Sequence, residues 1–564
     1  MHSLWTRIHT LVLPVLVILI AAACQEAGVG TGRQRSDPEP NAALRSLVDG
    51  TALDAAVTGP QMPAAERKKL VDQVRRFYQR QHYQLMWIDG ERPSRRYGDL
   101  VKILSGAEEH GLPRALYLTP IPDGSGEDMK ISAEQAPDLD VKATATFFRY
   151  SLHLSSGRLD PRDLQPLWTL RPQKPDLVEA LATAVTQNDL AKVVSQLEPA
   201  QPEYQELRKA LVRYRAIAAK GGWPSLPANT KLKPGQQSAV MPALRQRLAI
   251  EGDLDAEHEQ TAGTTYDSIA VSAVKRFEER HRFEPDGVLD ADAVKALNQP
   301  VERRIRTIEL NMERLRWLPD AMPSRYLMVN VPDFHLEAVE NQQTVMDIRV
   351  VVGAPDNKTP IFADQMTHVV FSPYWNVPSG IAEEETIPRA AGDPDFLSRN
   401  NMEVVGPNGE VMESSSVDWS NAKGLRIRQR PGSGNALGGV KFIFPNNFDV
   451  YLHDTNATKL FDRLERGLSH GCVRVEEPHK LAQYVLRDLP EWTPDAIAEA
   501  MKSGEEKHVK LKTSIPVFIV YQTATVHAGG VRFLEDLYGY DAGQAAKLWP
   551  DAERKDVGKL QSRR

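Results

Sequence analysis

The sequence has little cysteine and no excess of positive charge. Only Cys24 and Cys472 occur among its 564 residues. An unpaired cysteine is most often a small buried hydrophobe, and its reactivity is the other reason to keep it. The formal net charge is −6 at pH 7, and no Lys/Arg run is interleaved with aromatic residues. We therefore do not expect nucleic acid as a partner.

The apolar run at residues 11–20 is too short to span a bilayer comfortably, because a membrane helix needs about 20 apolar residues. It precedes the small residues "AAAC", as in a secretory signal peptide, so we expect residues 1–24 to direct export to the periplasm. Cys24 lies where bacterial lipoproteins carry an acylated cysteine, which would anchor the protein to a membrane. Most such motifs have Leu where Ala21 stands, so ordinary cleavage is the alternative. In both cases residues 25–42 are predicted to be a flexible tether.

A chain of 62.9 kDa is too long for one core, so we expect about three or four domains. Residues 43–236 have mostly helical periodicity with Gly/Pro stops, and this part of the sequence shows no metal-spaced His/Cys cluster, phosphate-binding glycine loop or nucleophile elbow. We interpret this region as a helical scaffold.

Residues 237–300 are predicted to be a small three-helix module. Its first helix carries Leu244 and Leu248 on one face, its second Ile269, Ala273 and Phe277, and a "PDG" turn leads to the third. The stretch from "MPALRQRLAIEGDL" to "DADAVKALN" resembles the peptidoglycan-binding domain of cell-wall enzymes. It departs from that family at Asp290 and Asp292, so a generic helical hairpin is the alternative. Affinity for glycan does not follow from the fold alone.

After a connecting helix at residues 301–323, the sequence becomes strand-like. Segments such as "RYLMVNV" and "GVKFIFPNNFDVYLHDT" alternate β-branched or aromatic residues with polar ones, so residues 324–531 are predicted to form a mostly β domain. The polar excursion at 381–439 is long enough to be a capping or lid insertion. Residues 532–564 are predicted to be a C-terminal tail. The whole chain is thus expected to be an α+β multidomain protein.

Strand alternation predicts which side chains share a face. In "FDVYLHDT", Val450 and Leu452 point one way and can fill the core, while Tyr451 and His453 point the other way. In the same manner, Cys472 and Arg474 lie on one face of the extended segment "CVRV". A thiol, an imidazole and a guanidinium could therefore converge across neighbouring strands.

Such a cluster has a chemical use. An imidazolium lowers the pKa of a nearby thiol, so we expect His453 to activate Cys472 as a nucleophile and to return the proton to a leaving amine. The N–H groups of Gly471 and Cys472 could stabilise an oxyanion, and Arg474 could bind a substrate carboxylate. The pattern predicts acyl transfer through a thioester.

The spacing of His453 ahead of "SHGCVR" resembles the signature of the L,D-transpeptidase catalytic domain, and the domain order resembles its large periplasmic members. The resemblance implies Cys472 as nucleophile and His453 as proton donor and acceptor, oriented by a backbone carbonyl. Tyr451, Ser469, Gly471 and Arg474 match family positions that line the site. His470 is the alternative base, although we favour a structural role for it. Trp375 is either a substrate wall or a core residue.

The implied reaction joins the third residues of two peptidoglycan stem peptides and releases D-alanine, with no metal or nucleotide. Water as acceptor would instead give a carboxypeptidase or hydrolase. A wall-binding scaffold with an inactive catalytic fold is the third interpretation, and the presence of both Cys472 and His453 argues against it.

Overall fold

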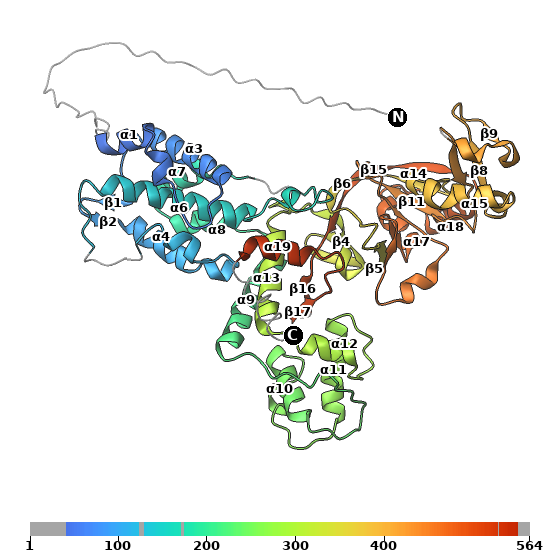
Figure 1. Ribbon diagram of the computed structural model, residues 1–564, viewed down its shortest axis with the longest axis horizontal. Helices are drawn as coiled ribbons and strands as arrows, with labels where there is room; N and C mark the ends of the chain where they lie inside the picture. Colours follow the sequence, from blue (N-terminus) through green and yellow to red (C-terminus); the bar gives the residue numbers. More distant parts are fainter. Residues whose placement is uncertain (1–40, 123–128, 171–173, 423, 528–529, 551–564) are drawn as a thin grey trace, which may run out of the picture.

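The computed structural model describes residues 41–122, 129–170, 174–422, 424–527 and 530–550. A helical domain lies at one end of the molecule, a β domain with an insertion at the other, and a small helical module extends to one side (Figure 1). This arrangement confirms the predicted α+β multidomain fold class. The predicted signal peptide with Cys24, and nearly all of the predicted tether, lie outside the described residues. Within the described ranges, no helix has the length and apolar character to cross a membrane.

The N-terminal helical domain packs around one central helix, α6, which is buried on almost every side. Its Asp140 accepts hydrogen bonds from the Tyr78 hydroxyl and from the backbone N–H groups of Met86 and Trp87, so a buried carboxylate joins three segments. The strands β1 (Ile88–Asp89) and β2 (Arg92–Pro93) form a short hairpin beside it. The helices of this region are α1 (Ala42–Asp49), α2 (Leu53–Ala56), α3 (Ala64–Arg80), α4 (Arg95–Ser105), α5 (Ala115–Leu118), α6 (Ala136–Ser156), α7 (Leu177–Gln187), α8 (Leu190–Ser195) and α9 (Pro202–Ala219).

The small module consists of α10 (Met241–Glu251), α11 (Ser268–Arg280) and α12 (Ala291–Leu297). Its core includes Leu244 and Leu248, as predicted, but the prediction for α11 was wrong at Ile269, which is 41% exposed. Ala270, Val274 and Phe277 are the buried residues there, together with Ala273. Residues spaced by four do not stay on one face of a helix, because the helix has 3.6 residues per turn. Ile269 therefore lies outside the buried face that Ala273 and Phe277 share.

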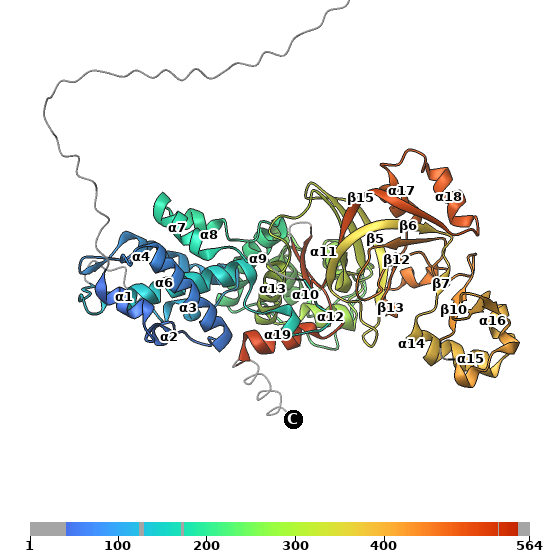
Figure 2. The ribbon, with the colours of Figure 1, turned by 90° about the horizontal axis from the view of Figure 1, so that it is seen from above.

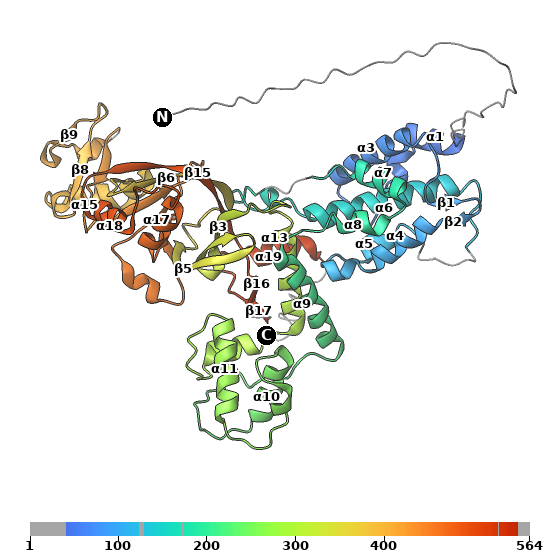
Figure 3. The ribbon, with the colours of Figure 1, turned by 180° about the vertical axis from the view of Figure 1, so that it is seen from behind.

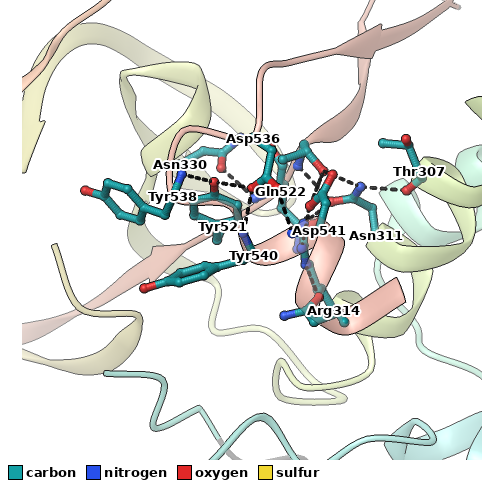
Figure 4. A network of polar contacts seen from close by, with 12 residues as sticks. Thr307, Asn311, Arg314, Asn330, Tyr521, Gln522, Asp536, Tyr538, Tyr540 and Asp541 are labelled. Carbon is teal, nitrogen blue, oxygen red and sulfur yellow. Dashed lines mark hydrogen bonds and ion pairs between the residues drawn. The ribbon is translucent and has the colours of Figure 1, made fainter. Parts of the chain in front are cut away.

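The connecting helix α13 (Val301–Leu315) packs against α9 and α19 (Tyr540–Leu548). Figure 4 shows the polar contacts at this junction: Arg314 reaches Asp541, with 2.6 Å between Nη2 and Oδ1, and Asn311 donates to Thr523. Residues 530–548, most of them assigned to a tail from the sequence, therefore form a strand and a helix that pack on the body of the protein.

The largest sheet in the described part of the chain has nine strands in the order β13-β5-β14-β12-β11-β6-β15-β3-β4. Strand β4 also pairs with β5, so the sheet closes on itself. Helices α17 (Pro478–Leu486) and α18 (Pro494–Lys502) pack nearby, and β16 (Ala524–His527) pairs with β17 (Gly530–Phe533) outside the main sheet. The strands of the main sheet are β3 (Arg325–Asn330), β4 (His335–Glu340), β5 (Gln343–Gly353), β6 (Phe362–Phe371), β11 (Val440–Ile443), β12 (Leu452–His453), β13 (Gly467–Ser469), β14 (Val473–Val475) and β15 (Lys507–Val520).

The predicted excursion forms a separate subdomain, which we call the cap, at the far end of the β domain (Figure 2). Its four strands lie in the order β7-β10-β8-β9 and have their own small core, which includes Leu397, Val404 and Ile427. The elements of the cap are β7 (Trp375–Asn376), α14 (Ser379–Ile381), a π-helical turn (Ala382–Thr386), α15 (Ile387–Gly392), α16 (Phe396–Arg399), β8 (Met402–Val405), β9 (Val411–Met412) and β10 (Arg426–Gln429).

The small module is held to the body of the protein by hydrogen bonds to β17 (Figure 3). Arg280 donates to the carbonyl of Val531 over 2.6 Å, and Arg532 donates back to the carbonyl of Arg280 over 3.1 Å. His281 is hydrogen-bonded to the carbonyl of Phe533 over 3.2 Å. Hydrogen bonds therefore join the end of α11 to β17, the strand that leads into the C-terminal segment.

Candidate active site

Two cross-strand rows of side chains form the site. Strand β12 pairs in parallel with β14 and antiparallel with β11, which places Arg474, His453 and Lys441 opposite one another in one row. The neighbouring residues Leu452, Val473 and Phe442 are fully buried and hold these strands in the core. Tyr451 and Cys472 lie in the next row on the same face, and the Val473 N–H donates to the carbonyl of Tyr451 over 3.1 Å. The chain thus brings the predicted thiol, imidazole and guanidinium together, with Lys441 as an additional cation.

Cys472 is a free, partly exposed thiol, and its Sγ lies 3.8 Å from the carbonyl oxygen of Asp449. Burial raises the pKa of the Cys472 thiol above its ordinary value. Hydrogen bonding from Tyr451 and the charges of Lys441 and Arg474 oppose that rise. The expectation that an imidazolium lowers this pKa is therefore not met. The causes that lower it are Tyr451 and two basic side chains, and His453 is not among them.

His453 is buried, and its Nδ1 lies 2.5 Å from the carbonyl oxygen of Asp454. A carbonyl can only accept, so Nδ1 carries the proton and Nε2 keeps the lone pair that a general base needs. Burial, with the charges of Arg474 and Lys441, lowers the pKa of His453 to about 3. The imidazole is neutral at neutral pH, so it can accept a proton but supplies no positive charge in advance.

The loop before Cys472 is shaped by Ser469. The Ser469 hydroxyl donates to the carbonyl of Cys472 over 2.5 Å and accepts from the Gly471 N–H over 3.1 Å. Gly471 has φ of +113°, which favours glycine, and its carbonyl accepts from the Thr359 hydroxyl over 2.8 Å. Because Ser469 engages the Gly471 N–H, the expectation that this group is an oxyanion donor is not supported. In the described structure no group accepts from the Cys472 N–H, which leaves that donor for an oxyanion.

Arg474 and Lys441 flank the histidine. Arg474 has a buried Nε with no hydrogen-bond partner among the described residues, so its guanidinium is not fully committed to protein partners. Lys441 Nζ lies 3.8 Å from the centre of the Tyr451 ring. Sequence reasoning missed Lys441, although its position next to the buried Phe442 in "GVKFIF" marks it as a lone charge on the other face of that strand.

His470 faces the cap rather than the thiol. It is exposed, and its Nε2 lies 3.1 Å from Oε1 of Glu385 in the cap's π-helical turn. This geometry supports a structural role for His470 rather than that of the base. Trp375 is half-buried in β7, at the start of the cap, and pairs with Gln429 of β10. It lies outside the apolar core of the cap.

The neck of the cap, at Ser372 and Gly439, is tied to His453 through Asp454, a residue that sequence reasoning also missed. The carboxylate of Asp454 accepts from the Gly439 N–H over 2.7 Å, while its backbone carbonyl orients His453. Across the neck, the Ser372 N–H donates to the carbonyl of Gly439 over 2.9 Å. Both sides of the neck therefore meet one residue away from His453.

Known families match this chain in three places. Residues 324–517 match the L,D-transpeptidase catalytic domain, residues 237–297 a peptidoglycan-binding domain, and residues 72–211 a scaffold domain. The chain thus contains an L,D-transpeptidase catalytic domain joined to a peptidoglycan-binding domain, which confirms the family prediction.

A curated relative from Haemophilus influenzae, provisionally named an L,D-transpeptidase, is 33% identical over 237 residues. The match covers 42% of this chain and 48% of the relative, so the chain spans about half the length of that protein. Solved L,D-transpeptidases are more distant. One from Mycobacterium smegmatis shares 9% identity over 35% of this chain and 58% of that one, with a TM-score of 0.17. One from Xylanimonas cellulosilytica shares 15% over 52% and 100%, also with a TM-score of 0.17.

Proposed function

We propose that this protein is an exported peptidoglycan L,D-transpeptidase that cross-links the third residues of two stem peptides through a thioester on Cys472. One observation supports it most directly. Cys472, His453 and Arg474 share one face of adjacent strands, inside the region that matches the L,D-transpeptidase catalytic domain.

The first half-reaction acylates the enzyme. Nε2 of His453 takes the thiol proton as Sγ of Cys472 attacks the amide carbonyl of the third residue, a diamino acid, in a tetrapeptide stem. The Cys472 N–H stabilises the oxyanion of the tetrahedral intermediate. The C–N bond then breaks, His453 returns its proton to the leaving amine, and D-alanine departs. A thioester remains on Cys472.

The second half-reaction transfers the acyl group. The side-chain amine of another stem attacks the thioester carbonyl, and His453 accepts a proton from that amine. The C–S bond then breaks, and His453 passes the proton to Sγ to regenerate the thiol. Because the thioester conserves the energy of the original amide, no nucleotide or metal is needed. Water at the same step would give the carboxypeptidase or hydrolase reaction instead.

The remaining parts of the chain fit a wall substrate. The guanidinium of Arg474 would bind a stem carboxylate, and Trp375 would line the substrate's path on the side of the cap. The module at 237–297 would bind peptidoglycan itself. Residues 1–24 would direct export to the periplasm, and lipidation of Cys24 would add a membrane anchor.

The proposal is tested with purified protein and disaccharide-tetrapeptide, with products read by mass spectrometry. We expect cross-linked dimers and free D-alanine from the wild type, and a loss of at least about 1,000-fold in the Cys472→Ala and His453→Ala variants. His508→Ala is the matched control, because His508 is an exposed histidine on β15.

Each outcome has one meaning for the proposal. Dimers that vanish in Cys472→Ala support transfer. A monomer that has lost D-alanine, without dimers, means that water is the acceptor and that the enzyme is a hydrolase. No product from a folded wild type would contradict any enzymatic role and favour the wall-binding scaffold.

A further inference from the structure

Lys441 is a cation in the site that the proposed mechanism does not use. It lies half-buried on β11, directly across from His453, and its Nζ approaches the Tyr451 ring to 3.8 Å from the ring centre. In the described part of the chain it takes part in no ion pair. Burial lowers the pKa of Lys441, and the charge of Cys472 is the largest of those that raise it. A thiolate on Cys472 and the ammonium of Lys441 therefore stabilise each other.

The nucleophile needs a counter-charge that His453 does not provide. A thiolate in crowded, poorly solvated surroundings is costly unless a positive charge lies near it. The buried imidazole of His453 is neutral until it has taken the proton, so it cannot stabilise the thiolate beforehand. The register of the sheet instead places two basic side chains on this face, one on either side of the imidazole, from β11 and β14.

Of these two cations, Lys441 is the better placed for the thiolate. Arg474 lies on β14, two residues after Cys472, and its guanidinium, which has no ion pair among the described residues, suits a substrate carboxylate. Lys441 approaches from the opposite side, over the ring of Tyr451, the residue beside Cys472. Among the charges that lower the pKa of the thiol, that of Lys441 is the larger.

We propose that Lys441 is a positioning residue of the reaction, whose ammonium acts through Cys472 by stabilising its thiolate across the Tyr451 ring. The inference rests on the proposed role of Cys472 as the nucleophile. Lys441 thereby supplies the positive charge that the sequence pattern had suggested for an imidazolium.

The thiol is faced by a limited set of other charged or titratable groups. Asp449, in the turn before β12, presents its carbonyl to Sγ, and the charge of Glu506, before β15, raises the pKa of Lys441. The full set among the described residues comprises Lys441 from β11, His453 from β12, Arg474 from β14, and Asp449, Tyr451 and Glu506 from the connecting segments. Among the described residues, Lys441 and Arg474 are the basic side chains that lower the pKa of the thiol. We therefore expect the removal of Lys441 to raise that pKa.

The test is the pH dependence of alkylation of Cys472 by iodoacetamide, because only the thiolate reacts. The Cys472 peptide is followed by mass spectrometry, separately from Cys24. Lys441→Met and Lys441→Gln remove the charge but keep an unbranched stem against Tyr451. We expect both to raise the alkylation midpoint by about one pH unit. Lys441→Arg should restore the wild-type midpoint, and Lys510→Met, an exposed lysine on β15, should not change it.

The result that would overturn the inference is an unchanged midpoint in both uncharged variants while circular dichroism shows a native fold. A shift in Lys441→Arg as large as in Lys441→Met would also overturn it, because packing rather than charge would then be responsible. The assay contains no peptidoglycan. An unchanged alkylation midpoint therefore leaves the transpeptidase proposal intact. A lack of product in the assay with disaccharide-tetrapeptide likewise leaves the alkylation result intact.

Discussion

At the scale of single residues, the structure changes how the proposed nucleophile and base work together. A buried His453 with a pKa of about 3 and a thiol whose pKa burial raises form a neutral pair at rest, not an ion pair. Proton transfer then accompanies attack on the carbonyl. This is consistent with the hydrogen bond to the carbonyl of Asp454, which fixes the proton on Nδ1.

The pH profile of acylation should report this arrangement. The folded pKa of His453, about 3, lies below the ordinary value of 6.5, so the base stays competent as the pH falls through 6 and 5 and is lost only near 3. We therefore expect kcat/KM for release of D-alanine to vary less than threefold between pH 5 and 7.5. The release of D-alanine is the right measurement because it does not depend on the protonation of the acceptor amine. An acid limb centred near 6.5 would contradict a depressed pKa for His453.

Strand alternation in the sequence placed Tyr451 with His453, and Cys472 with Arg474, because the side-chain period of two is a local property. Which strands lie side by side is not local. Lys441 and Asp454 became visible only when β11 and the neck of the cap were placed beside β12.

At the scale of elements, the C-terminal segment supports the loop that carries Cys472. The Tyr538 hydroxyl donates to the carbonyl of Gly353 over 2.8 Å and accepts from the Thr359 N–H over 3.0 Å. The Thr359 hydroxyl in turn holds the carbonyl of Gly471. Figure 4 shows Tyr538 beside Tyr521 and Asp536, which anchor it to β15 and to the start of α19. A segment outside the catalytic motif thus fixes the motif's backbone.

Removing the Tyr538 hydroxyl should affect stability and catalysis together. Tyr538→Phe leaves the buried Thr359 N–H without its partner, so we expect a loss of about 1–3 kcal/mol in the free energy of unfolding and slower release of D-alanine. Urea denaturation and the acylation assay measure the two effects. Tyr540→Phe is the control, since Tyr540 packs in the same aromatic cluster and its hydroxyl has no hydrogen bond within the described residues. Equal behaviour of the two variants would show that the Tyr538 hydrogen bonds do not support the loop.

At the scale of the whole molecule, the peptidoglycan-binding domain is joined firmly to the catalytic domain. Arg280 connects the carboxylates of Asp253 and Glu251 inside the small module with the carbonyl of Val531 on β17. The same strand leads to the Tyr538 segment. The module is therefore positioned relative to the site rather than loosely tethered to it.

Loss of Arg280 should destabilise this junction. In Arg280→Ala, the buried carboxylate of Asp253 loses its ion-pair partner and Glu251 keeps only its pair with Arg247, so we expect a loss of about 3–5 kcal/mol in the free energy of unfolding. Limited proteolysis should also release the module earlier than in the wild type. Lys275→Ala, an exposed lysine on the same helix, is the control. Equal melting temperatures and cleavage rates for the two variants would mean that the contact with β17 does not hold the module.

The sequence by itself determined the fold class, the order of the domains and the face of each strand that carries Cys472 and His453, because these follow from local periodicity and from one specific motif. The tertiary structure decided the rest. It left Ile269 exposed, placed the Gly471 N–H on Ser469, turned His470 towards Glu385 and put Lys441 beside His453. It also reversed the expected direction of the thiol's pKa shift. Burial and charge at a site come from strands far apart in the chain, so their balance is set only when those strands pack together.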